Sequence, residues 1–199
     1  MNTLLLMVIL FMNTINPKYY NIILEMSKKF NVEPEIIMAI IKWESNWNEK
    51  AYLFEKNVND YSVGLMQVRY DTAKSMGFTG KFEELFDPYI NIYYGTRYLK
   101  SRLDKYSDLP FKIQIATYNS GSPLWTDIFH TRVKNQNYAD IVYKYYIEYK
   151  NMELPKDPII EPIEDIESKK IDNLNQSIIF GLILGIIGIY LYIKLGGKK

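Results

Sequence analysis

Apolar residues recur along this chain with the spacing of α-helices. In the clearest run, Ile37, Ile40, Ile41 and Glu44 follow the i, i+3, i+4, i+7 pattern of one helix face. Further helices are expected at residues 17–30, 71–76, 88–106, 110–121 and 138–149. No convincing pair of strands is found, and residues 47–62 are predicted to form a loop. The sequence therefore predicts a mainly α domain.

Glu44 is a carboxylate on a face that is otherwise apolar. Burying an ionised carboxylate without a partner is costly, and the usual outcome is a raised pKa that keeps the group protonated. A helix end near Ser45 or Asn46 would raise the pKa of Glu44 further through the negative end of the helix dipole. We interpret Glu44 as a proton donor. The alternative is a glutamate that turns to solvent or pairs with a lysine.

The N-terminal segment differs in character from the middle of the chain. Residues 1–16 contain an apolar run from Leu4 to Met12, which is too short to span a bilayer, where about 20 residues are needed. We interpret this segment as an export signal or an uncleaved anchor. The alternative is a first helix packed on the domain.

The C-terminal part of the chain predicts a linker followed by a membrane span. In residues 151–176 prolines alternate with acidic residues, which favours an extended linker. Residues 177–193 are uncharged and almost wholly apolar and Lys194 follows them, which predicts a C-terminal transmembrane helix over residues 177–195; a buried core helix is the alternative. Together these segments predict a single-pass membrane protein whose domain, residues 17–150, lies outside the cytoplasm.

Composition excludes several classes of function. The formal net charge of +1 gives no broad basic field, so no nucleic-acid partner is expected. The chain has no cysteine, which excludes disulfides, cysteine-rich zinc sites and a thiol nucleophile. His130 is the single histidine, and the Asn57-x-Asn59 sequence lacks the glycine and glutamate of a calcium loop. No metal and no cofactor are therefore expected.

Several short motifs follow one another along the chain: Trp43-Glu44-Ser45, Gly64-Leu65-Met66-Gln67-Val68 and Ala116-Thr117-Tyr118-Asn119-Ser120-Gly121. In this order they resemble the signature motifs of the soluble lytic transglycosylase (SLT-type, goose-lysozyme-like) family, which cleaves peptidoglycan. Residues 86–99 look like the structural helix of that family, and residues 138–149 are similar to its closing tyrosine helix. The resemblance extends from about Tyr19 to Tyr149.

The resemblance implies a lysozyme-like helical domain with a groove for peptidoglycan glycan strands. Together with the predicted membrane span, it implies a location in the cell envelope or a virion membrane. Glu44 would act as catalytic acid and base, and the β-1,4 bond between N-acetylmuramic acid and N-acetylglucosamine would be cleaved without water, leaving a 1,6-anhydro end. The substrate-binding residues that it implies are Ser62, Gly64, Met66, Gln67, Tyr118, Asn119 and Tyr138.

Two other functions stay open at this point. A hydrolytic lysozyme of the inverting kind needs a second carboxylate about 6.5–9.5 Å from the acid, and the candidates are Asp60 first and Glu55 second. Goose-type lysozymes carry acids around the second motif, where this chain has Arg69, and this difference favours the transglycosylase. The other alternative is a non-catalytic wall-docking component of a virion or a secretion apparatus, with envelope or virion assembly partners.

Overall fold

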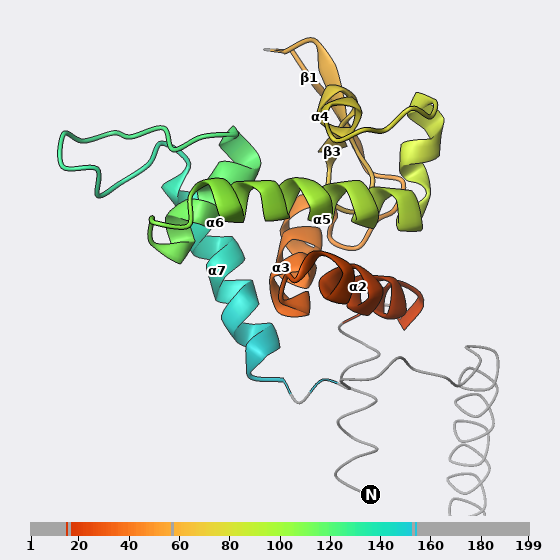
Figure 1. Cartoon of the computed structure of the whole chain (residues 1–199), viewed down its shortest axis with the longest axis horizontal. Helices are drawn as coiled ribbons and strands as arrows, with labels where there is room; N and C mark the ends of the chain where they lie inside the picture. Colours follow the sequence, from red (N-terminus) through yellow and green to blue (C-terminus); the bar gives the residue numbers. More distant parts are fainter. Residues whose placement is uncertain (1–14, 16, 57, 153, 155–199) are drawn as a thin grey trace, which may run out of the picture. The chain divides into compact units, whose positions relative to one another are not determined.

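The computed structural model describes residues 15, 17–56, 58–152 and 154 of the 199-residue chain (Figure 1). Its elements follow in the order α2 (Pro17–Phe30), α3 (Pro34–Ser45), β1 (Tyr52–Glu55), β2 (Asp60–Val63), β3 (Val68–Arg69), α4 (Tyr70–Ser75), η1 (Phe82–Phe86), α5 (Pro88–Lys105), α6 (Phe111–Ser120) and α7 (Gln136–Lys150). The fold is mainly helical, and the predicted helices are confirmed to within a few residues at their ends.

The helix ends form where the sequence places suitable capping residues. Pro34 occupies the first turn of α3, where its missing N–H group is not needed. The Asp87 side chain accepts a hydrogen bond from the Ile90 N–H group at 3.0 Å and caps α5. At the other end of α3, Asn46 takes the left-handed conformation with a φ of 48°. The expected end of α3 near Ser45 is therefore confirmed.

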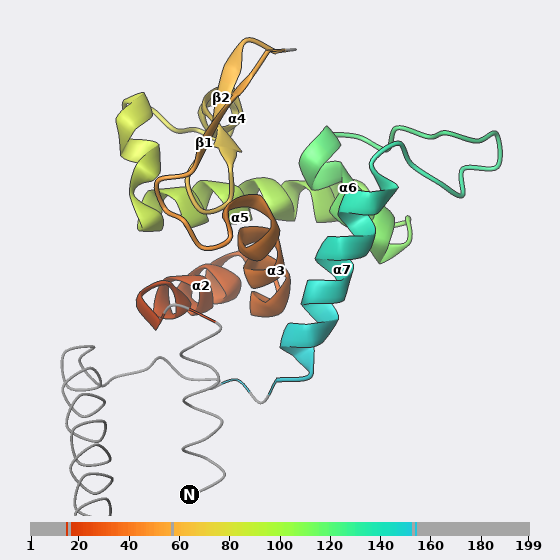
Figure 2. The ribbon, with the colours of Figure 1, turned by 180° about the vertical axis from the view of Figure 1, so that it is seen from behind.

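Helix α3 forms the centre of the described domain. Its residues from Ile36 to Ile41 are all buried. Helices α2 and α7 pack against it, and α5 runs across the same region and contacts both α2 and α6 (Figures 1 and 2). The core is thus built around the helix whose last turn carries Glu44.

The expectation of no strand pair is wrong. Strands β1, β2 and β3 form a three-stranded antiparallel sheet in that order, with Tyr52 opposite Val63 and Ser62 opposite Arg69. These strands are only two to four residues long, and β1 is an exposed edge strand with apolar side chains on both faces. The alternation of apolar and polar residues by which the sequence of a half-buried strand is recognised is therefore missing from β1.

The predictions for residues 1–16, 151–176 and 177–195 fall almost entirely outside the described residues. Of these segments the structure describes Ile15, which is buried, and residues 151, 152 and 154. Within the described part of the chain no helix is both long enough and apolar enough to cross a membrane.

Candidate active site

The carboxylate of Glu44 lies at the end of α3, close to side chains from the sheet, from α6 and from α7. Part of its surface remains accessible, yet burial among protein atoms raises its pKa from 4.5 to about 7. The negative charge of Glu55 raises this pKa further, and the Tyr138 hydroxyl lowers it. No salt bridge to Glu44 occurs in the described domain. The predicted upward shift of this pKa is confirmed, and Glu44 is protonated in a large fraction of molecules at neutral pH.

Tyr138, in the first turn of α7, places its hydroxyl beside Glu44. Its hydroxyl is buried and lies close enough to the Glu44 carboxylate to interact with it, although without ordinary hydrogen-bond geometry. Burial raises the pKa of Tyr138 well above its usual value of 10, so the phenol keeps its proton. The ring of Tyr138 packs edge-on against Trp43, with 6.0 Å between the ring centroids. This contact fixes the phenol beside the acid.

The second motif forms a tight turn that joins β2 to β3. Gly64 has a φ of 73° and its N–H group donates to the Ala51 carbonyl at 2.7 Å. The side-chain amide of Gln67 donates to the carbonyls of Ala51 at 3.1 Å and of Gly64 at 2.9 Å. In this structure the Gln67 side chain therefore stabilises the turn itself.

Asn91 holds this turn against α5, a role that the sequence patterns did not predict. The buried side chain of Asn91 donates to the carbonyls of Val63 and Leu85, both at 2.8 Å, and accepts from the Met66 N–H group at 2.8 Å. A Cβ atom on Gly64 would lie 2.4 Å from the amide nitrogen of Asn91, so only glycine fits there. The sequence does contain a sign of this role, because Asn91 is a polar residue next to the apolar Ile92 in the predicted helix.

The third motif supports the same turn from the side of α6. The hydroxyl of Tyr118 donates to the Met66 carbonyl at 2.9 Å, and its side chain is buried. The Glu44 charge raises the pKa of Tyr118 in addition to the larger effect of burial, so the two residues are close. Asn119 accepts from the Asn135 side chain at 3.2 Å. The structure thus brings Tyr118 to the acid and directs Asn119 toward the start of α7.

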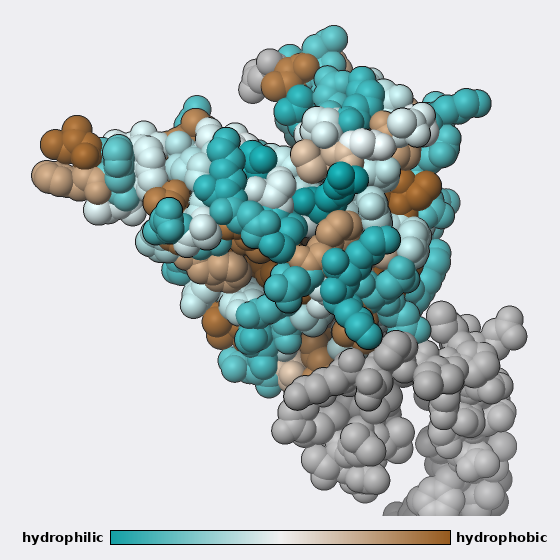
Figure 3. Space-filling model, viewed as in Figure 1, coloured by the Kyte–Doolittle hydropathy of each residue, from teal (hydrophilic) through white to brown (hydrophobic). Residues whose placement is uncertain are grey.

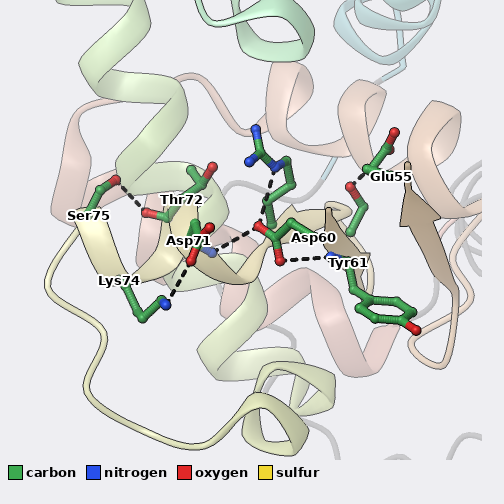
Figure 4. Close-up of polar contacts among 9 residues, drawn as sticks. Glu55, Asp60, Tyr61, Asp71, Thr72, Lys74 and Ser75 are labelled. Atoms are coloured by element: carbon green, nitrogen blue, oxygen red, sulfur yellow. Dashed lines mark hydrogen bonds and ion pairs between the residues drawn. The ribbon is translucent and has the colours of Figure 1, made fainter. Parts of the chain in front are cut away.

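The two candidate second carboxylates differ in their surroundings (Figure 4). Asp60 forms a salt bridge with Arg69 at 3.4 Å and accepts from the N–H groups of Tyr61 at 2.7 Å and Asp71 at 3.1 Å. Glu55 accepts a hydrogen bond from the buried Ser62 hydroxyl at 3.2 Å, and its charge is the one that raises the pKa of Glu44. The order expected from the sequence is therefore reversed, because Asp60 is engaged in holding β2, β3 and α4 together.

Helices packed around a central α3, a small sheet beside them and an acid of raised pKa at the end of α3 define a lysozyme-like helical domain. Residues 21–140 match the family described as the Transglycosylase SLT domain. The match covers more than half of the chain, so this chain belongs to that family.

Individual relatives agree with this assignment. The chain is 31% identical over 96 residues to a protein of Enterobacteria phage PRD1 named transglycosylase, covering 48% of this chain and 32% of that protein. It is 35% identical over 98 residues to membrane-bound lytic murein transglycosylase C of Shigella sonnei, covering 46% of this chain and 26% of that protein. The chain thus matches about a third or less of the length of these relatives.

A solved structure shares the fold. The X-ray structure of an inactive mutant of the lytic transglycosylase Slt from Pseudomonas aeruginosa superposes with a TM-score of 0.54 and 22% sequence identity, covering 70% of this chain and 25% of that chain. At this identity the likeness concerns the fold.

Proposed function

We propose that this chain is a peptidoglycan lytic transglycosylase with Glu44 as its catalytic acid and base. The observation that carries the proposal is a partly exposed Glu44 at the end of α3, beside Tyr138 and Glu55, whose pKa is raised to about 7, since a general acid works best when its pKa is near the working pH. Membership of the SLT family and the names of the relatives support the same activity and substrate.

The reaction needs one carboxyl group in two protonation states. Protonated Glu44 gives its proton to the oxygen of the bond between N-acetylmuramic acid and N-acetylglucosamine. The bond from this oxygen to C1 of N-acetylmuramic acid breaks as positive charge develops on that sugar. The resulting carboxylate then removes the proton from the C6 hydroxyl of the same sugar, whose oxygen bonds to C1 and closes the 1,6-anhydro ring. Glu44 regains its proton and no water is consumed.

We assign substrate binding to residues around the acid and along the turn between β2 and β3. Tyr138 interacts with Glu44 and orients its carboxyl group. Met66 and Gln67 belong to the turn, and Tyr118, which is close to Glu44, holds that turn through the Met66 carbonyl. The rest of the proposed set consists of smaller polar residues and one glycine: Ser62, Gly64 and Asn119.

We also propose the arrangement of the whole chain. Residues 17–150 form the catalytic domain, residues 151–176 an acidic linker and residues 177–195 a transmembrane helix, while residues 1–16 are signal-like or an anchor. The support is the apolar, uncharged character of residues 177–193 and the lysines that follow them. In this arrangement the domain lies outside the cytoplasm, next to the peptidoglycan.

Hydrolysis is the second candidate, and Glu55 is the observation that favours it. Its carboxylate is close enough to raise the pKa of Glu44, and a second carboxylate near the acid could activate a water molecule. The product would then be a reducing sugar instead of a 1,6-anhydro sugar.

Mass spectrometry of the fragments released from purified peptidoglycan by the full chain in detergent tests these proposals. A transglycosylase gives products that are one water lighter than the hydrolysed sugars, and Glu44→Gln abolishes them. Products that carry an added water would establish hydrolysis. Wall binding without any cleavage would establish the docking component. Glu35→Gln, at the other glutamate of α3, is the matched control.

A further inference from the structure

The loop between α6 and α7 carries the two most exposed large apolar side chains of the described domain. Ile128 is 87% exposed and Phe129 is 79% exposed. They are adjacent in sequence, and Figure 3 shows apolar atoms at the far left, where this loop projects in Figure 1. Such a pair at a projecting tip has no role in the folded core.

The base of this loop is firmly attached to the domain. Trp125 and Val133 form an antiparallel bridge, and the Lys134 N–H group donates to the Leu124 carbonyl at 2.7 Å. Val133 is buried in a cluster with three apolar residues of α6 and α7, which are Ile113, Ala116 and Ala139. The tip is therefore presented by a fixed support.

The tip itself is also shaped by specific contacts. The Asp127 carboxylate accepts from the N–H groups of Phe129 at 3.0 Å, Thr131 at 3.1 Å and Arg132 at 2.8 Å. The His130 ring stacks on Trp125 with 4.9 Å between centroids. These contacts keep the backbone polar groups occupied while both apolar side chains of the tip stay exposed.

The charge around the tip is basic. Arg132 and Lys134 are exposed, and within the described residues neither takes part in a salt bridge. The one carboxylate of the loop, Asp127, is directed at the backbone. An apolar tip that is followed closely by two basic side chains matches the boundary between the acyl chains and the anionic headgroups of a bilayer.

We propose that this loop docks on the surface of an anionic lipid bilayer, with Ile128 and Phe129 inserted between the headgroups. The inference rests on the proposed membrane attachment, which keeps the domain beside a bilayer. The loop precedes α7 and the linker follows it, and α7, with 15 residues, is roughly 22 Å long. Residues 155–176 reach at most about 75 Å, so the linker allows the loop to meet the bilayer in which the chain is anchored.

The absence of cysteine from the chain allows a direct test with single labels. The full chain with Ile128→Cys, carrying an environment-sensitive nitrobenzoxadiazole dye, is reconstituted into vesicles of phosphatidylcholine and phosphatidylglycerol that contain doxyl-labelled lipid. The matched control is Val58→Cys, an exposed position between β1 and β2. We expect a blue-shifted emission at position 128 and quenching at least about twofold stronger than at position 58. Vesicles of phosphatidylcholine alone should give a smaller blue shift and weaker quenching at position 128.

Other outcomes would overturn the proposal. Equal quenching at the two positions would show that the loop does not contact the bilayer. Protection of the label only after peptidoglycan is added would assign the tip to the cell wall, and protection that increases with protein density would assign it to a second copy. Flotation of the vesicles distinguishes a failure of the proposed loop contact from a failure of the proposed membrane anchor. A chain that floats with an unquenched label retains its anchor and lacks the loop contact, whereas a chain that does not float lacks both.

Discussion

Asp60 and Glu44 are two carboxyl groups of one small domain with contrasting surroundings. Asp60 is 7% exposed and is held by the Arg69 guanidinium and by two backbone N–H groups. Glu44 is more accessible, has no salt-bridge partner among the described residues and faces one phenol and another acid. The carboxylate with many donors is suited to holding elements together, whereas the one with few donors is left free to exchange a proton.

The largest expected effect is the loss of activity in Glu44→Gln. The substitution keeps the shape of the side chain and removes the transferable proton, so cleavage should fall by about 10²–10⁴-fold or more. Release of fragments from purified peptidoglycan measures the effect, with Glu35→Gln as control. Retention of full activity by the variant would exclude Glu44 as the acid.

The second effect is a loss of stability in Asp60→Ala. The substitution removes the ion-pair partner of the Arg69 guanidinium and the acceptor of the Tyr61 and Asp71 N–H groups, which should cost about 2–3 kcal/mol. Urea denaturation of the full chain in detergent measures it. Asp71→Ala, which removes an exposed acid paired with Lys74, should leave stability almost unchanged. Equal effects of the two variants would contradict the structural role of Asp60.

The third effect is a gain of stability, and it concerns Glu44→Gln again. Because its pKa is raised in the folded chain, Glu44 binds its proton more tightly there than in the unfolded chain. Stability therefore falls as pH rises from 4.5 to about 7 and then levels off. The variant lacks this loss, so its free energy of unfolding should exceed that of the wild type by about 2–3 kcal/mol at pH ~8, after a discount for the accessible part of the side chain, and by little at pH ~4. Urea denaturation at both pH values measures the difference, and a difference that does not change with pH would contradict the raised pKa.

The smallest effects are shifts in the pH dependence of cleavage, measured as fragment release across a pH series. Glu55→Gln removes a negative charge and lowers the pKa of Glu44, so the alkaline limb of the pH profile of cleavage should move to lower pH. Tyr138→Phe removes the donor that lowers this pKa, so the same limb should move to higher pH. Tyr145→Phe, on the same helix as Tyr138, is the control. Shifts in the same direction for both variants would contradict the described surroundings of Glu44.

The sequence was sufficient where local chemistry determines structure. Proline and aspartate at the helix starts and the apolar face of α3 predicted the helices, and the same face predicted the raised pKa of Glu44. The sheet was missed because β1 exposes apolar residues on both faces. The environments of Asp60 and Glu55 depend on the register between β1 and β2, which pairs these two residues, and on α4, and no sequence pattern specifies such long-range contacts.

The three hydrogen bonds of Asn91 also have a consequence for the order of local opening. Because the Met66 N–H group donates to this side chain, its amide can exchange with solvent only when the turn separates from α5. Hydrogen exchange at the Met66 amide therefore reports the separation of this turn from α5. The position of the turn beside Glu44 is maintained for as long as these hydrogen bonds to Asn91 stay formed.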